Sequence, residues 1–142
     1  MPAAQESVES AIQALAAADD KKAVRPVLLD VADVLGLVDL FAIVSCTSDR
    51  HVKAVSDEVE RQMKQDHDRA VVRREGTPVS GWIILDYGDL VVHVFHEETR
   101  ELFNLERLWR DVPTLDPTTG AITFSGMAST ERIDDGDVLV EG

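Results

Sequence analysis

The chain has 142 residues and a formal net charge of −13 at pH 7, and 44% of its residues are hydrophobic. This length and apolar content suit a single folded domain with its own buried core. A surface this acidic repels the phosphate backbone of nucleic acids, so we expect no direct nucleic-acid binding. Charge complementarity instead favours a basic protein as the partner.

The cysteine content and the N-terminal residues bear on the compartment. Cys46 is the sole cysteine, so it has no partner for an intramolecular disulfide, which favours a reducing environment. The first ten residues lack the basic and apolar segments of a secretory signal, and no apolar run reaches the ~20 residues of a membrane helix. We therefore expect a cytoplasmic protein with no membrane partner.

The first half of the chain predicts alternating helices and strands. Apolar residues at helical spacing predict helices over residues 7–18 and 49–66. Two short apolar runs, at residues 27–31 and 40–46, predict buried strands. A further short strand is expected at residues 70–74, before a loop that ends at Gly81.

The second half predicts a hairpin followed by a helix. Residues 82–87 and 90–95 are rich in β-branched and aromatic residues, and Gly88 with Asp89 between them suits a tight turn. Residues 97–109 then predict one helix with large apolar side chains. Strands alternating with helices predict an α/β fold, and the hairpin makes its sheet mixed.

The composition changes after Val112. Residues 113–142 begin with a turn-rich stretch that contains Pro113, Pro117, Thr118, Thr119 and Gly120, and an acidic end follows, so we interpret them as a flexible tail. A small strand near Ala121–Phe124 is the less favoured interpretation. The predicted organisation is an α/β domain over residues 1–112 and a tail over residues 113–142.

Three stretches of the sequence resemble the ribosomal silencing factor family, the Iojap-like proteins. The first matching positions are Asp39, Phe41, Ile43, Ser48, Arg50, His51 and Val52. The hairpin matches at Trp82, Ile83, Asp86, Tyr87, Gly88, Asp89, Val92, His93 and Phe95. The helix after it matches at Arg100, Phe103, Leu105, Glu106, Leu108 and Trp109.

The resemblance implies a compact domain, nucleotidyltransferase-like in shape, that regulates translation without catalysis and without a cofactor or metal. The implied partner is a large-subunit ribosomal protein of the L-fourteen type at the intersubunit face, where binding blocks the small subunit. Homologues are often homodimers, so a homodimer is also expected. Aromatic residues are common at the centres of protein interfaces. The candidate contact residues are therefore Trp82, Asp86, Tyr87, Asp89, Arg100, Phe103 and Glu106.

Two other functions stay open on the residues alone. One is a magnesium-dependent nucleotidyl- or phosphoryl-transferase that uses Asp86 and Asp89. The junction before the second helix, Cys46 to Asp49, argues against it, because it lacks the glycine that lets a backbone approach a phosphate. The other is a structural assembly factor for the large subunit, which would make the same contacts on immature particles.

Overall fold

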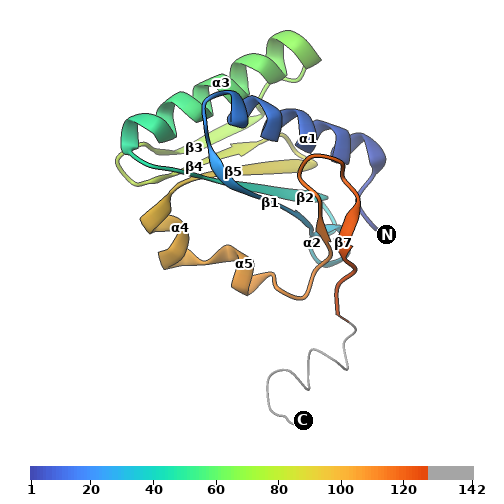
Figure 1. Cartoon of the computed structure of the whole chain (residues 1–142). Helices are drawn as coiled ribbons and strands as arrows, with labels where there is room; N and C mark the ends of the chain where they lie inside the picture. Colours follow the sequence, from blue (N-terminus) through green and yellow to red (C-terminus); the bar gives the residue numbers. More distant parts are fainter. Residues whose placement is uncertain (128–142) are drawn as a thin grey trace.

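A computed structural model describes residues 1–127 of the chain (Figure 1). The helices are α1 (Gln5–Asp20), α2 (Ala32–Leu35), α3 (Asp49–His67), α4 (Glu97–Phe103) and α5 (Leu105–Leu108). The strands are β1 (Val24–Asp30), β2 (Leu40–Cys46), β3 (Arg73–Thr77), β4 (Trp82–Asp86), β5 (Leu90–His96), β6 (Thr114–Leu115) and β7 (Ile122–Phe124).

All seven strands form one mixed sheet in the order β3-β4-β5-β2-β1-β6-β7. The central strands β2 and β5 pair in parallel, from Leu40 opposite Leu90 to Cys46 opposite His96. The other neighbouring strands pair antiparallel, including the β4–β5 hairpin. The predicted α/β fold with a mixed sheet is confirmed.

The long helices α1 and α3 pack side by side on one face of the sheet (Figure 1). α3 turns its apolar stripe inward, and Val52, Val55, Val59 and Met63 are fully buried. Its helical spacing is the reason, because residues three and four apart share a helix face. Alternate residues of the strands meet these helices and complete the main core.

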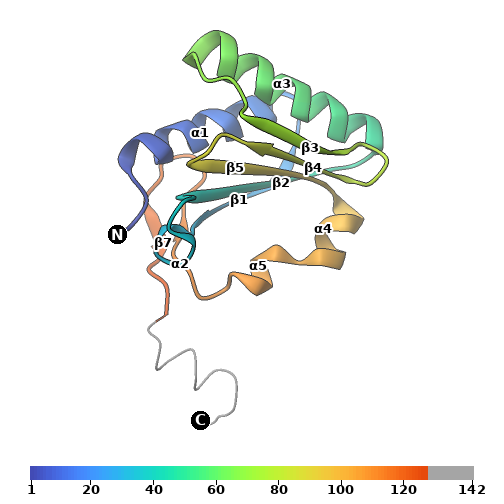
Figure 2. The ribbon, with the colours of Figure 1, turned by 180° about the vertical axis from the view of Figure 1, so that it is seen from behind.

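The opposite face of the sheet carries the short helices α4 and α5, which lie on the side away from α1 and α3 (Figure 2). Its core is smaller and contains Leu29, Val31, Ile43, Phe95 and Val112. Trp82 and Trp109 are partly buried against it. Of the helices in residues 1–127, none is both long enough and apolar enough to cross a membrane.

The segment predicted as one helix over residues 97–109 is two helices. Asn104 has a φ of 49°, a left-handed conformation that ends α4, and its side chain accepts a hydrogen bond from the backbone N–H of Arg107 in α5. Asparagine adopts this conformation more readily than most residues. The chain therefore turns at Asn104 instead of continuing straight.

The strand before the hairpin lies three residues later than predicted, over Arg73–Thr77. Its Gly76 suggested a loop, yet Gly76 pairs with Ile83 inside the sheet. A Cβ atom at Gly76 would lie 2.0 Å from the backbone oxygen of Trp82. Glycine is needed there because two backbones pass too closely for any side chain.

Residues 113–127 differ from the flexible tail that their composition predicted. β6 pairs with β1, with Leu115 opposite Leu28, and β7 pairs with β6. Leu115 is only 4% exposed and belongs to the main core. These residues thus extend the sheet, whereas the rest of the predicted tail, residues 128–142, lies outside the described part of the chain.

Candidate partner-binding surface

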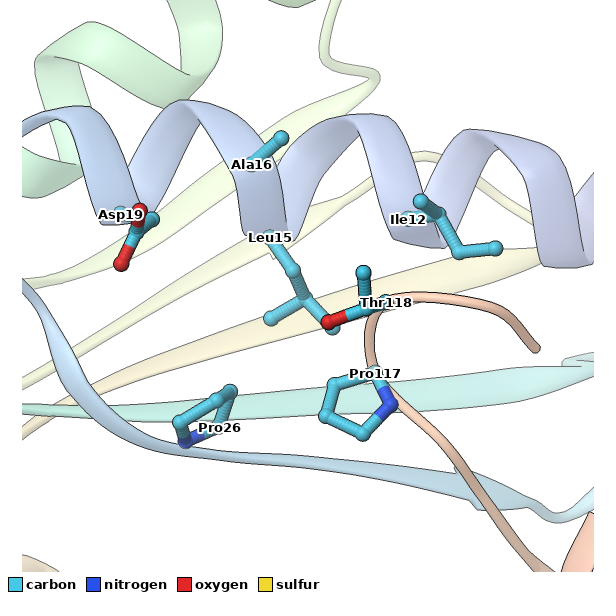
Figure 3. A pocket seen from close by; sticks show the side chains of 7 residues that line it. All are labelled: Ile12, Leu15, Ala16, Asp19, Pro26, Pro117 and Thr118. Carbon is cyan, nitrogen blue, oxygen red and sulfur yellow. The ribbon is translucent and has the colours of Figure 1, made fainter. Parts of the chain in front are cut away.

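An apolar hollow lies between α1 and the turn from β6 to β7 (Figure 3). Its lining residues are Ile12, Leu15, Ala16, Asp19, Pro26, Pro117 and Thr118. Small-molecule sites combine apolar walls with several polar groups that converge on the ligand. Here Asp19 and Thr118 are the two polar side chains of the lining, so the hollow gives no catalytic arrangement.

Residues that could suggest a nucleophile or a metal site serve the fold. Burial, with a smaller contribution from Glu97, raises the pKa of Cys46 to about 12, which keeps its thiol protonated and unreactive. The Ser48 hydroxyl caps α3 by accepting a hydrogen bond from the His51 N–H at 3.0 Å. Within residues 1–127, no group of three or more His, Cys, Asp or Glu side chains is arranged to hold a metal ion.

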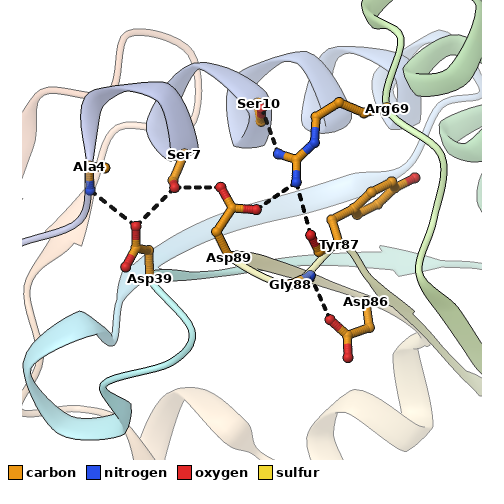
Figure 4. A network of polar contacts seen from close by, with 9 residues as sticks. All are labelled: Ala4, Ser7, Ser10, Asp39, Arg69, Asp86, Tyr87, Gly88 and Asp89. Carbon is orange, nitrogen blue, oxygen red and sulfur yellow. Dashed lines mark hydrogen bonds and ion pairs between the residues drawn. The ribbon is translucent and has the colours of Figure 1, made fainter.

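The turn between β4 and β5 is held by its own carboxylates (Figure 4). Gly88 has a φ of 94°, as a tight turn requires, and its N–H donates to Asp86 at 2.8 Å. Arg69 donates to Asp89 at 2.7 Å, and Ser7 Oγ lies 2.5 Å from Asp89. Asp86 and Asp89 therefore fix the turn against its surroundings.

The pKa of Asp89 reflects these contacts. Burial alone would raise it, but the hydrogen bonds from Arg69 and Ser7 outweigh burial and hold the pKa below its usual value. Arg69 also donates to Ser10 of α1 at 2.9 Å and to the carbonyl of Tyr87 at 2.9 Å. Asp89 is thus the centre of a network that ties α1 to the hairpin.

The other end of the hairpin carries a group of aromatic rings. The Trp82 ring centroid lies 4.7 Å from that of Phe95 and 4.8 Å from that of Phe103. Trp82 Nε1 donates to His93 Nδ1 at 3.2 Å, which leaves the ring hydrogen of neutral His93 on Nε2. Because this N–H is already bonded, Trp82 offers a partner its ring and not a donor.

Phe103 is the exposed member of this group. It ends α4, and 53% of its surface is accessible, whereas Phe95 beneath it is fully buried. Exposing a phenylalanine against a tryptophan leaves apolar area in water, which a partner could cover with a gain of free energy. Trp82 and Phe103 are called the aromatic surface below.

Two predicted contact residues, Tyr87 and Arg100, are buried, and this corrects their assignment to a partner. Tyr87 is 3% exposed and belongs to the core beneath α1 and α3. It lies an odd number of residues from Trp82, and successive residues of a strand point to opposite faces. Arg100 is 2% exposed and bonds inside the protein.

The remaining predicted residues are divided between the two faces of the sheet. Asp86 lies an even number of residues from Trp82, so both point to the same face, and the Asp86 side chain is 29% exposed. Glu106 of α5 is also 29% exposed and pairs with Arg100 at 2.9 Å. The structure thus brings Trp82, Phe103, Asp86 and Glu106 to the α4 face and places Tyr87 and Asp89 towards α1.

Several exposed apolar residues on α4, on α5 and after α2 were not among the predicted contact residues. Leu102 is 78% exposed and Leu108 is 74% exposed. Leu37, just after α2, is 89% exposed. The signal was present in residues 97–109, because apolar residues on every side of a helix cannot all face one core.

Comparison with known proteins gives the family. A family model described as ribosomal silencing factor during starvation matches residues 4–136. The chain belongs to the ribosomal silencing factor family. A ribosomal silencing factor RsfS from Halalkalibacterium halodurans is 37% identical over 112 residues, which cover 79% of this chain and 92% of that protein.

Further relatives agree in sequence and in fold. A mouse protein named mitochondrial assembly of ribosomal large subunit protein 1 is 33% identical over 84 residues, which cover 58% of this chain and 37% of that protein. A crystal structure of a protein from Chromobacterium violaceum has a TM-score of 0.70 at 29% identity and covers 75% of this chain and 88% of that one. The predicted family is confirmed, and it is a family of ribosome-silencing regulators.

Proposed function

We propose that this protein binds a ribosomal protein of the large subunit, of the L-fourteen type, and sterically blocks joining of the small subunit. The aromatic surface carries the proposal, because Phe103 exposes half of its area beside Trp82 with no core above it. The family supports it, and so does the mouse relative, whose name links it to the large ribosomal subunit.

Acidic side chains on the same face of the sheet as the aromatic surface indicate a preferred partner chemistry. Asp86 and Glu106 lie on the same face as Trp82 and Phe103, and each carboxylate is partly exposed. The whole chain carries a net charge of −13. Lysines and arginines on a basic ribosomal protein would be attracted to these carboxylates and to the net negative charge, while apolar residues of that protein would cover the rings.

The proposed mechanism needs no bond chemistry. A bound protein occupies volume at the intersubunit face, so the small subunit is excluded for as long as the complex lasts. The transferase alternative would need Asp86 and Asp89 to share a cation. Hydrogen bonds from Gly88, Arg69 and Ser7 already engage their oxygens, which favours docking over metal chemistry.

Location and self-association complete the proposal. If the protein binds bacterial ribosomes, it acts in the cytoplasm, and the relative from Halalkalibacterium halodurans is a bacterial protein. Two copies would associate through exposed leucines such as Leu37 and Leu108, which would remove apolar area from water. Sedimentation equilibrium checks this: a dimer that Leu108→Asp converts to a monomer supports self-association, and a monomer at all concentrations contradicts it.

The binding proposal is tested by sedimentation with purified ribosomal particles through a sucrose gradient. The protein should migrate with free large subunits, and Phe103→Ala should weaken binding by at least about tenfold, the loss typical of a residue at the centre of an interface. Ile122→Ala, which shortens an exposed side chain on β7, is the matched control.

Two results would count against the proposal. Protein that stays at the top of the gradient at every concentration would rule out a stable complex with the large subunit. Migration with immature particles but not with mature large subunits would favour an assembly factor instead.

A further inference from the structure

One buried charged side chain, Arg100, holds α4 to the sheet, whereas Leu105 of α5 packs partly buried against the smaller core. Within residues 97–108, all of which the structure describes, Arg100 is the single buried residue. The apolar residues Leu102, Phe103 and Leu108 of the same helices are exposed. Apolar burial therefore contributes little to the position of α4, and the contacts of Arg100 must supply much of it.

The guanidinium of Arg100 reaches the ends of two strands. Its Nη1 donates to Ser45 Oγ of β2 at 2.8 Å and to the carbonyl of Arg25 in β1 at 2.6 Å. Arg25 has a φ of 54°, and the register of β1 against β2 shifts between Val24 and Val27. Such a bulge changes the direction of backbone groups, and here it points the carbonyl of Arg25 towards the buried guanidinium of Arg100.

The other side of the guanidinium bonds across the break between the two helices. Nε donates to one carboxylate oxygen of Glu106 at 3.3 Å, and Nη2 donates to the other at 2.9 Å. Arg100 belongs to α4 and Glu106 to α5, with the left-handed Asn104 between them. A planar guanidinium that binds both oxygens fixes an angle as well as a distance.

Phe103 lies inside the segment that this pair closes. It is the last residue of α4, and its ring centroid lies 4.8 Å from that of Trp82. Because the ring is 53% exposed, packing covers it on only part of its surface. Phe103 precedes Asn104 in the same helix as Arg100, so the position of α4, which the hydrogen bonds of Arg100 fix, decides whether the ring stays against Trp82.

We propose that Arg100 is a positioning residue for ribosome binding: through Ser45, Arg25 and Glu106 it holds the α4–α5 turn so that Phe103 stays beside Trp82. Arg100 itself touches no partner. This inference rests on the proposed function for its consequence, whereas the ring geometry can be tested without a ribosome.

The first test measures the ring contact alone. In wild-type protein, nuclear Overhauser effects should connect the Phe103 ring with the Trp82 indole. Arg100→Met should abolish them while the effects among Val52, Val55 and Val59 in the main core persist. Arg61→Met is the matched control, because Arg61 also donates two hydrogen bonds to one carboxylate, that of Glu58, on the exposed side of α3.

A second variant covers the case in which Arg100→Met does not fold. Glu106→Gln keeps the shape of the side chain and removes its charge, so the ring contact should weaken while the fold remains. Persistence of the Phe103–Trp82 effects in a folded Arg100→Met or Glu106→Gln protein would overturn the proposal.

The second test separates positioning from a general loss of structure by a double-mutant cycle on large-subunit affinity. Arg100→Met should weaken binding about tenfold in the wild-type background, a loss of the size that one interface anchor supplies. In the Phe103→Ala background it should add less than about twofold, because the ring it positions is absent. Arg100→Lys, whose ammonium group cannot form the paired hydrogen bonds of a guanidinium, should give an intermediate loss of affinity.

The outcomes of the cycle are distinct. Equal losses in both backgrounds would show that Arg100 acts independently of Phe103 and would overturn the positioning role. If wild-type protein does not bind large subunits at all, the proposed function fails, and the ring contact in the Arg100 and Glu106 variants then decides the inference on its own.

Discussion

Trp82 and Tyr87 lie close together in the sequence but on opposite faces of the sheet. Tyr87 is buried beneath the long helices, and its hydroxyl has no hydrogen-bond partner among the described residues. Burial is also the largest cause that raises the pKa of Tyr87 to about 12, so the phenol stays neutral. These features indicate a core residue whose ring matters and whose hydroxyl does not.

Tyr87 variants test this assignment. Tyr87→Phe should leave the free energy of unfolding unchanged or slightly higher, because it removes an unpaired buried hydroxyl. Tyr87→Ala should lower it by about 3 to 5 kcal/mol, as expected for deleting a buried ring. Urea unfolding measures both. A folded Tyr87→Phe protein that loses ribosome binding would contradict the core assignment.

His93 gives the molecule a defined response to acid. Burial lowers its pKa from 6.5 to about 4, so the folded protein holds it neutral while the unfolded chain becomes protonated first. Protonation would also place a hydrogen on Nδ1, the atom that accepts from Trp82. The stabilising contribution is therefore complete above pH 6.5 and is lost as the pH falls from 6.5 to about 4.

The expected size follows from that shift. Between pH 6.5 and about 4, wild-type protein should lose on the order of 3 kcal/mol more stability than His93→Asn, which keeps an acceptor but cannot titrate. Unfolding in urea at several pH values measures the difference. A His93→Asn protein with the same pH slope as wild-type protein would contradict this assignment.

At the scale of elements, the strands and long helices were predicted well because their side chains repeat with a clear period. β2 was predicted with the bounds that the structure has, and α3 differs from its prediction by one residue at its end. The pairing of the strands into one sheet was harder to predict, because β2 and β5 are far apart in the sequence and pair in parallel.

The elements that were predicted wrongly depend on contacts that no local pattern contains. Asn104 divides the last helix because its side chain and backbone serve two helix ends at once. β6 is two residues long, and its place at the sheet comes from pairing with β1. For the candidate surface, the alternation of side chains along β4 and β5 would have been enough to predict that Tyr87 is buried. The burial of Arg100 could not be predicted in this way, because it depends on the bulge in β1.

The β6–β7 segment can be tested as part of the folded domain. Leu115→Ala should lower the free energy of unfolding by about 2 to 5 kcal/mol, because Leu115 is 4% exposed in the main core. Ile122→Ala, at 65% exposure on the neighbouring strand, should change it by less than about 0.5 kcal/mol. Thermal unfolding measures both; equal, small effects would indicate that this segment adds little to the fold.

At the scale of the whole molecule, the two faces of the sheet are covered differently. α1 and α3 cover one face and form the main core, while the other face carries a smaller core beneath two short helices. The second face leaves Phe103 exposed next to Trp82, with Arg100 fixing the turn that presents it. Under the proposed function, the main core and the partner-binding surface therefore lie on opposite sides of one sheet.

The most direct test of the account is a subunit-joining measurement by light scattering with purified large and small subunits. Large subunits incubated with wild-type protein should join small subunits less as the protein approaches saturation, and Phe103→Ala at the same concentration should restore joining. Unchanged joining by large subunits that demonstrably carry the bound protein would contradict steric exclusion.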